Sequence, residues 1–336
     1  MSIRGKEIIA LLVIVAGSII AYSIKLSGGG GFEFPLWLSI VVIVLLGISL
    51  VLILILTVTG RLVGRRLVFL YVGIAIALPL FMPLTQKIPI SPEAQMLYDS
   101  IGELSPGSKV LMSFDYDPPS APELQPMAES FIRLCFERDL KIIMIGLWPQ
   151  GPQQADLALE QILSDPEIEA KNLEYGVDYV NLGYQVGGEF VIQRMGTDFS
   201  SMFSRDVTGT PYSEIPLVRN VRNFSNIDHV FNLSAGFPGT VEWIQLAVDR
   251  YGVELSAGNT AVQAPTIYTY LNAGQCVGLL GGMNGAAEFE SLIDYEAKAT
   301  KYMLSQSFAH LIVIAFVIIG NVAYFLGGRE KALKSV

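Results

Sequence analysis

Two aspartates stand two positions apart directly after a short apolar run. Asp115 and Asp117 follow residues 109–114 and precede two prolines. Carboxylates at positions i and i+2 could share a divalent cation through hard oxygen ligands, as metal-dependent hydrolases and transferases use them. The same side chains could instead organise the proline-rich turn through hydrogen bonds to the backbone. The sequence leaves both interpretations open, and a divalent cation at Asp115 and Asp117 is its one suggestion of a cofactor.

Three further loops contain glycine and follow other apolar runs, at residues 146–151, 234–240 and 281–285. Where such a loop opens a helix, free backbone N–H groups and the helix dipole favour an anion. Tight turns between strands and helices would need the same glycines, with Thr240 as a helix cap. No loop is a P-loop, because no Gly-Lys-Ser/Thr follows, and Leu280 stands where the dinucleotide fingerprint has its first glycine. The candidate ligand-binding residues, besides the two aspartates, are Trp148, Ser234, Gly236, Gly239, Thr240, Gly281, Gly282, Asn284 and Gly285.

Residues that commonly perform catalysis are scarce. His229 and His310 are the only histidines, which excludes zinc sites built from histidine and cysteine, and no G-x-S-x-G nucleophile elbow occurs. The sequence therefore predicts no catalytic residue, and an enzyme is the less favoured interpretation. Cys135 and Cys276 could form one disulfide in an oxidising compartment or remain buried free thiols, and two cysteines leave both alternatives open.

The elements that would position these residues alternate between short apolar runs and amphipathic stretches. Apolar strands separated by helices indicate a buried parallel sheet. We therefore expect an α/β fold, with a doubly wound, mostly parallel, Rossmann-like sheet within residues 87–305. The expected strands are 109–114, 141–147, 178–182, 229–233, 253–256 and 276–280. The expected helices are 123–138, 153–163, 239–250 and 264–272.

Three segments of this domain lack that alternation. Residues 88–108 are rich in proline, glycine and serine, which is typical of a linker. Residues 196–226 are irregular, and we interpret them as an excursion that covers one end of the sheet or contacts a partner. From Gly285 onward a helical pattern without proline continues into the last apolar segment. We therefore expect one continuous helix that connects the sheet rigidly to that segment.

Hydrophobic residues make up 51% of the 336 residues, and the mean hydropathy is +0.48, which is high for a soluble protein. The excess lies in four segments, at about residues 7–24, 35–58, 67–84 and 308–326. Each approaches the roughly 20 apolar residues that cross a bilayer as a helix. We expect a four-helix membrane anchor, with three helices in residues 1–86 and a fourth, before a short basic tail, in 306–336. The first segment could also be a signal peptide, although no clear cleavage site follows it.

Basic residues flank the apolar segments unevenly and thereby predict their orientation. With the N-terminus inside, Lys25 is the only basic residue of the short outer loop. The inner basic residues are Arg4, Lys6, Arg61, Arg65, Arg66, Arg329, Lys331 and Lys334. Both termini are therefore expected in the cytoplasm, and residues 87–305 outside it. That domain holds 28 acidic residues against 13 basic ones, which argues against a nucleic acid as its partner.

These observations favour a membrane-anchored extracytoplasmic α/β domain that binds a ligand or a partner protein. Such a domain would serve as a structural or assembly subunit of a membrane complex in the cell envelope. Its partners would be membrane lipid and either other membrane proteins or further copies of itself. The alternative is a metal-dependent extracytoplasmic hydrolase or transferase that uses Asp115 and Asp117. A transporter or channel is disfavoured, because Asn321 is the only strongly polar residue well inside an expected span, and His310 lies at the edge of one.

Overall fold

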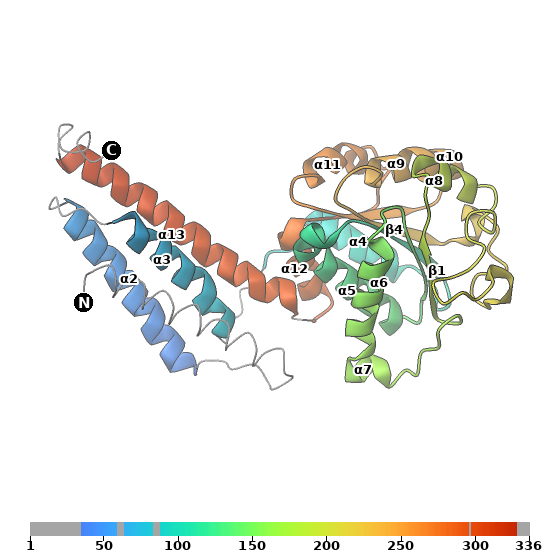
Figure 1. The fold of residues 1–336 in the computed structure, drawn as a ribbon, viewed down its shortest axis with the longest axis horizontal. Coiled ribbons are helices and arrows are strands. Elements are labelled where there is room, and N and C mark those ends of the chain that lie inside the picture. Colours follow the sequence, from blue (N-terminus) through green and yellow to red (C-terminus); the bar gives the residue numbers. More distant parts are fainter. Residues whose placement is uncertain (1–34, 59–63, 83–87, 296, 328–336) are drawn as a thin grey trace. The chain divides into compact units, whose positions relative to one another are not determined.

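The computed structural model divides the chain into two units (Figure 1). The described residues are 35–58, 64–82, 88–295 and 297–327. The helix unit comprises residues 1–86 with 301–336, and the α/β unit comprises residues 87–300. The first predicted span, residues 7–24, lies outside the described residues.

The helix unit contains apolar helices that pack on one another. They are α2 (Leu36–Val58), α3 (Arg65–Ala77) and most of α13 (Lys298–Gly327). Ile53, Tyr71 and Ile312, one from each helix, are buried in the same cluster, and the rings of Tyr71 and Phe316 meet edge to face. A 3₁₀ turn (Leu78–Phe81) that contains Pro79 follows α3. Proline cannot continue the hydrogen-bond ladder of the helix, which explains why α3 ends there.

Two of these helices are long and apolar enough to cross a membrane, over Leu36–Thr57 and Lys298–Val322. The apolar helix over Val68–Phe81 is shorter. Core helices of soluble proteins are mostly buried, whereas only 6% of the most apolar stretch of α2 and 22% of that of α13 are buried. Helices of spanning length are thus confirmed at the second and fourth predicted segments.

The α/β unit is built on a six-stranded parallel sheet with the order β3-β2-β1-β4-β5-β6. Its strands are β1 (Lys109–Asp115), β2 (Lys141–Gly146), β3 (Tyr179–Tyr184), β4 (His229–Ser234), β5 (Leu255–Asn259) and β6 (Leu279–Gly281). This order is that of the Rossmann fold, so the predicted doubly wound sheet is confirmed. Every residue of β4 and β5 is buried, as expected for strands covered on both faces. The last two strands begin later than predicted, at Leu255 and Leu279.

Helices cover both faces of the sheet, as Figure 1 shows. On one side lie α4 (Pro92–Gly102), α5 (Ala121–Glu137), α6 (Gly151–Leu163), α7 (Pro166–Glu169) and α12 (Gly282–Leu292). On the other lie α8 (Glu189–Met195), α9 (Thr240–Trp243), α10 (Asp249–Tyr251) and α11 (Ala264–Asn272), with a π-helical turn (Ile244–Val248) between α9 and α10. Phe131 of α5 stacks on Phe231 of β4 with ring centroids 3.9 Å apart, while Trp243 packs with Leu111 and Val230 on the opposite face.

The interpretation of residues 88–108 as a linker is wrong, because they contain helix α4. The Ser91 hydroxyl accepts a hydrogen bond from Ala94 N at 3.4 Å, and Pro92 occupies the first turn, where it needs no N–H. Leu97 is fully buried. A Cβ on Gly278 would lie 2.5 Å from Leu97 Cα, so the helix packs directly beside the start of β6. Helix α4 therefore covers the β6 end of this face of the sheet.

The continuous helix expected from Gly285 onward is also wrong. Helix α12 ends at Leu292, and α13 begins only at Lys298. Between them Asp294 has a left-handed backbone with φ of 52°, which no α-helix contains. The buried Glu290 carboxylate accepts hydrogen bonds from three backbone N–H groups and from one hydroxyl. The donors are Ala297 N (3.1 Å), Ala299 N (2.9 Å), Thr300 N (2.8 Å) and Thr300 Oγ1 (2.7 Å). The Glu290 carboxylate thus accepts hydrogen bonds from the backbone N–H groups that are left without a partner where α13 begins. A continuous helix would have no such unpaired N–H groups at this point.

The irregular excursion, residues 196–226, packs against the sheet through its aromatic residues. Phe199 and Phe224 are buried and meet edge to face, and Phe224 contacts Trp243 in the same way. The excursion also reaches the outer side of β3, where Val207 N donates to Asn181 O at 3.1 Å. The prediction that this segment covers the sheet is therefore confirmed for the β3 edge. Whether it contacts a partner stays a prediction.

Cys135 and Cys276 are both buried free thiols. Cys135 belongs to α5, and Cys276 packs in the cluster that contains Leu111 and Val230 on the other face of the sheet. Of the two alternatives that the sequence left open, the structure has the free thiols.

We expect Glu290→Ala to destabilise the α/β unit by about 2–3 kcal/mol, because it leaves buried donors without an acceptor. Hydrogen exchange of residues 297–300 should accelerate as the first turn of α13 loses its cap. Urea unfolding of the full-length protein in detergent measures the loss of stability. Glu160→Ala is the matched control, because Glu160 is an exposed glutamate on α6. Equal effects of the two variants would contradict this role of Glu290.

Candidate functional site

The carboxyl ends of β1 and β4 meet in the centre of the sheet. From these two neighbouring strands the chain leaves toward opposite faces, with α5 after β1 and α9 after β4. In open parallel sheets a ligand crevice forms at such a switch point. Asp115 is the last residue of β1 and is fully buried there. We call the loops that follow the six strands the carboxyl edge.

The Asp115 carboxylate accepts hydrogen bonds from four groups on different parts of the chain. Leu147 N, just after β2, donates to Oδ1 at 2.8 Å, and Asn232 Nδ2 of β4 donates to Oδ2 at 2.7 Å. Trp243 Nε1 of α9 donates to Oδ2 at 3.0 Å, and the Ser113 hydroxyl lies 2.9 Å from both oxygens. One carboxylate therefore connects three strands with the helix above them.

Burial raises the pKa of Asp115 from 3.8 to about 6, and the four donors oppose part of that rise. Removing a carboxylate from water disfavours its charged form, whereas hydrogen bonds to its oxygens favour it. The group is thus ionised at neutral pH and is held by donors alone. It becomes protonated in mildly acidic solution.

The hydrogen bonds continue from Asn232 toward β5. Thr240 Oγ1 donates to Asn232 Oδ1 at 2.7 Å and accepts from Asn259 Nδ2 at 2.9 Å. The hydroxyl of Thr240 thus points into the buried network and does not cap the helix. Glu242 does so instead, because its carboxylate accepts from Gly239 N at 2.8 Å.

Trp148, Ser234, Gly236 and Gly239 lie together over the end of β4. The indole N–H of Trp148 donates to Pro238 O at 2.9 Å, and a Cβ on Gly236 would lie 3.0 Å from its ring. A Cβ on Gly239 would lie 2.0 Å from the Ser234 hydroxyl oxygen. Because β1 lies between β2 and β4, a side chain that reaches from the β2 loop to the β4 loop crosses the end of β1. Trp148 therefore covers the switch-point crevice, and the glycines permit this close packing.

The predicted residues Gly281, Gly282, Asn284 and Gly285 lie apart from this group, at the end of β6. Gly282 has a left-handed backbone with φ of 59°, and a Cβ on it would lie 2.8 Å from Ala261 Cβ. A Cβ on Gly285 would lie 2.8 Å from the backbone of Leu280. Asn284 donates a hydrogen bond to Glu288 within α12. These glycines allow α12 to start tightly against β6, and they are not brought to Asp115.

Asp115 and Asp117 have different surroundings. Asp117 is partly exposed and accepts a hydrogen bond from the Ser120 hydroxyl at 3.0 Å, which organises the turn before α5. Among the described residues no group of three or more histidine, cysteine and acidic side chains is arranged to hold a metal ion. The divalent cation at these two residues stays a prediction.

A small hollow opens between α9 and α11, and its lining includes two of the predicted ligand-binding residues, Gly236 and Thr240. Its volume is about 240 Å³. The lining residues are Gly236, Phe237, Thr240, Val241, Glu242, Val262, Gln263, Thr266 and Ile267. Phe237 is 68% exposed and Val262 is 88% exposed, so large apolar side chains stand at its mouth. Apolar residues in otherwise polar loops are the only signal of such a feature in a sequence.

Two more exposed apolar side chains continue this surface along the carboxyl edge. They are Val186 (73%) and Phe190 (57%), in the loop after β3 and at the start of α8. A Cβ on Gly188 would lie 3.3 Å from the Pro238 ring, so this loop touches the β4 loop next to Phe237. We call Val186, Phe190, Phe237 and Val262 the apolar rim.

We expect Asp115→Ala to destabilise the α/β unit by about 3 kcal/mol or more, because buried N–H donors on three segments would lose their acceptor. Urea unfolding followed by tryptophan fluorescence reports this change, since Trp243 donates to the same carboxylate. Asp117→Ala, in the same loop but partly exposed, should cost less than about 1 kcal/mol. A loss as large for Asp117 as for Asp115 would refute the structural role assigned to the buried carboxylate.

The raised pKa of Asp115 also predicts a pH dependence. The folded protein binds this proton more tightly than the unfolded chain, whose pKa is near 3.8. The protonated Asp115 therefore stabilises the fold fully below about pH 4, and this contribution is lost as the pH rises through about 6. The free energy of unfolding should fall by about 3 kcal/mol over this range. Asp115→Asn cannot exchange this proton, so its stability should fall less than that of the natural protein between pH 4 and pH 7. Parallel curves for the two proteins would contradict the assignment.

Comparisons of the chain with known protein families, with curated proteins and with solved structures give no match. The chemistry of the carboxyl edge is therefore inferred from its own residues. Three features characterise this edge. The buried Asp115 carboxylate accepts hydrogen bonds at both oxygens, Trp148 covers the switch-point crevice, and the apolar rim is exposed.

Proposed function

We propose that this protein is an assembly subunit of the cell envelope, whose membrane-anchored extracytoplasmic α/β domain docks an apolar segment of another membrane protein. The observation that carries this proposal is the apolar rim. Its four side chains are 57–88% exposed, and two of them, Phe237 and Val262, line a hollow of about 240 Å³. Contiguous apolar surface of this kind is typical of protein interaction sites.

The dimensions of the hollow favour a side chain as its occupant. Pockets for small molecules and cofactors usually measure roughly 300–1,000 Å³, and this one is smaller. A protruding apolar side chain of a partner would fit, with Phe237 and Val262 beside it and the polar Gln263 and Thr266 also in the lining. Apolar contacts combined with polar groups are usual in protein interfaces.

The covered switch point supports the same function. In this fold the crevice between the two central strands commonly receives the ligand. Here Trp148 covers it, and the Asp115 carboxylate below is already bonded to four donors. The crevice itself is therefore occupied, whereas the four side chains of the rim remain exposed.

The helix unit supports attachment to a membrane. The two helices of spanning length expose large apolar side chains that water would disfavour and lipid would solvate. Basic residues at alternate ends of the four predicted spans favour cytoplasmic termini and an extracytoplasmic α/β unit. Membrane lipid and other membrane proteins are thus the partners that we propose.

A cysteine introduced at Ser164 should react with a membrane-impermeant maleimide from the outer face of the membrane. Ser164 is exposed after α6, and the two natural cysteines are buried, so the background should be low. Intact spheroplasts provide the measurement, and a cysteine at Ser335 in the basic tail provides the cytoplasmic control. Labelling of position 164 only after the membrane is permeabilised would show that the orientation is reversed.

A photoreactive phenylalanine analogue at Phe237 should crosslink to one other membrane protein, at an apolar residue of that partner. The same analogue at Leu157, which is 48% exposed on α6, should not. In the purified complex Val262→Asp should weaken association at least about tenfold, because a charge would enter an apolar contact. The thermal unfolding of this variant should stay unchanged, since Val262 is 88% exposed.

The identity of the crosslinked species decides the outcome. A partner at a fixed ratio that dissociates with Val262→Asp supports docking at the rim. A crosslink to a second copy of this chain, or equal crosslinking from Phe237 and Leu157, would refute the proposed partner.

A further inference from the structure

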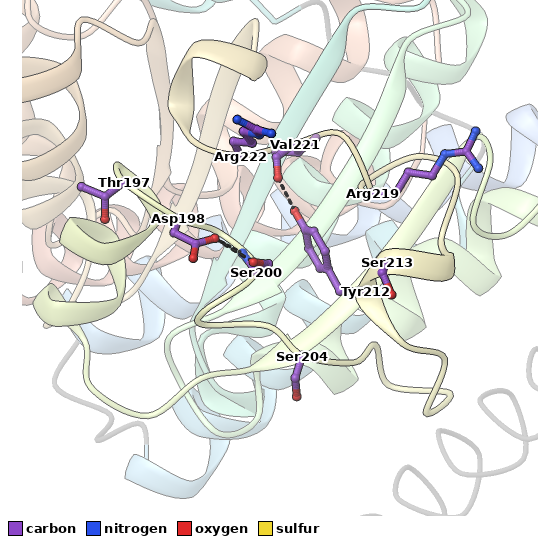
Figure 2. Close-up of a pocket in the computed structure, with 9 residues that line it drawn as sticks. All are labelled: Thr197, Asp198, Ser200, Ser204, Tyr212, Ser213, Arg219, Val221 and Arg222. Atoms are coloured by element: carbon purple, nitrogen blue, oxygen red, sulfur yellow. Dashed lines mark hydrogen bonds between the residues drawn. The ribbon is translucent and has the colours of Figure 1, made fainter.

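A second and larger hollow lies wholly within the excursion, as Figure 2 shows. Its volume is about 620 Å³, within the range of roughly 300–1,000 Å³ that small-molecule sites occupy. The lining residues are Thr197, Asp198, Ser200, Ser204, Tyr212, Ser213, Arg219, Val221 and Arg222. All of these except Val221 have a polar side chain, so the hollow suits a ligand rich in hydrogen-bonding groups.

The hollow carries positive charge in a strongly acidic domain. Its lining holds two arginines, Arg219 and Arg222, against the single acidic residue Asp198, whereas residues 87–305 as a whole hold 28 acidic against 13 basic residues. Arg219 and Arg222 are exposed, and within the described part of the chain neither side chain forms a salt bridge. Arginines without a counter-charge are ready to bind a carboxylate or a phosphate.

The backbone that forms the hollow is held in place. The Tyr212 hydroxyl donates to Val221 O at 3.0 Å, and Figure 2 shows Arg219 and Arg222 on either side of this bond. Phe199 N donates to Arg222 O at 2.8 Å, which joins the two ends of the excursion. A site whose backbone is already ordered loses less entropy when a ligand binds.

The remaining lining groups suit the hydroxyls of a sugar. Asp198 offers a carboxylate acceptor and already accepts from the Ser200 hydroxyl at 2.7 Å. Ser204, Ser213 and Thr197 add hydroxyls that can donate or accept. A plain inorganic anion would use the arginines and be repelled by Asp198. A molecule that carries both an anionic group and hydroxyls would use every part of the lining.

We propose that this hollow binds an anionic sugar, which is a carbohydrate that bears a carboxylate or a phosphate. Arg219 and Arg222 would bind the anionic group, and Asp198 with the neighbouring serines would bind the hydroxyls. This site goes beyond docking at the apolar rim and does not depend on it, because the two surfaces share no residue.

Calorimetric titration of the full-length protein tests the site, in a detergent whose headgroup is not a sugar. The probes are glucuronate, galacturonate and glucose 6-phosphate, with glucose and inorganic phosphate for comparison. At least one charged sugar should bind about tenfold or more tightly than glucose and than phosphate, because only the charged sugars satisfy both parts of the lining.

The double variant Arg219→Ala/Arg222→Ala should weaken that binding at least about tenfold without changing the melting temperature, since both side chains are exposed. Arg205→Ala is the matched control. Arg205 lies in the same excursion, but it donates to Gly209 O at 2.7 Å and does not line the hollow. This control should stay within about twofold of the natural protein.

Three results would overturn the proposal: no binding of any charged sugar, phosphate binding as tightly as glucose 6-phosphate, or equal effects of the double variant and the control. Each of these results leaves docking at the apolar rim unaffected, because that docking is measured by crosslinking at Phe237.

Discussion

The α/β unit depends on the requirement that a buried carboxylate be fully hydrogen-bonded. An unpaired charge inside a protein is strongly destabilising, so Asp115 can be buried only if donors surround it. Those donors come from the end of β2, from β4 and from α9, which are far apart in the sequence. Satisfying one side chain therefore fixes how the central strands and the helix above them meet. The excursion takes part as well, because Phe224 packs on Trp243, the residue that donates to Asp115. The position of Trp148 over the end of β1 also follows from this arrangement.

Two surfaces of opposite character result from this construction. The apolar rim belongs to loops that directly follow the strands, so its side chains project from a rigid sheet. The hollow of the excursion is polar and is framed by Tyr212 and by backbone hydrogen bonds. An apolar surface favours proteins and a charged polar one favours small anions, so the same domain can serve two partners without competition. The four side chains of the rim and the two arginines of the excursion are exposed and take no part in the buried network, so substitutions of these residues should leave the fold intact.

Much of the fold could be predicted from the sequence, because apolar runs such as residues 141–147 have few alternatives to a buried strand. Helix α11 was predicted with its observed bounds, Ala264–Asn272. Helix α4 was missed because its proline, glycine and serine suggested a linker, while the burial of Leu97 against Gly278 is a tertiary effect. The break before α13 was missed for a similar reason, since Glu290 caps that helix from a different one. At the site, Asp115 was correctly placed at the carboxyl edge. A metal ligand and a buried structural acid have the same local sequence, however, and only the surrounding donors distinguish them. The exposure of Phe237 and Val262 has no sequence signature beyond their place in loops.

The outer edge of strand β3 has a neighbour that limits access to its backbone. Residues near Val207 lie beside β3, and Val207 N donates a backbone hydrogen bond to Asn181 O. Proteins often recruit partners, or aggregate, when a foreign strand extends an open sheet. The excursion obstructs that route at the β3 edge. Recognition on this side of the domain then depends on side chains, so its specificity can change by point substitution in loops while the sheet remains the same.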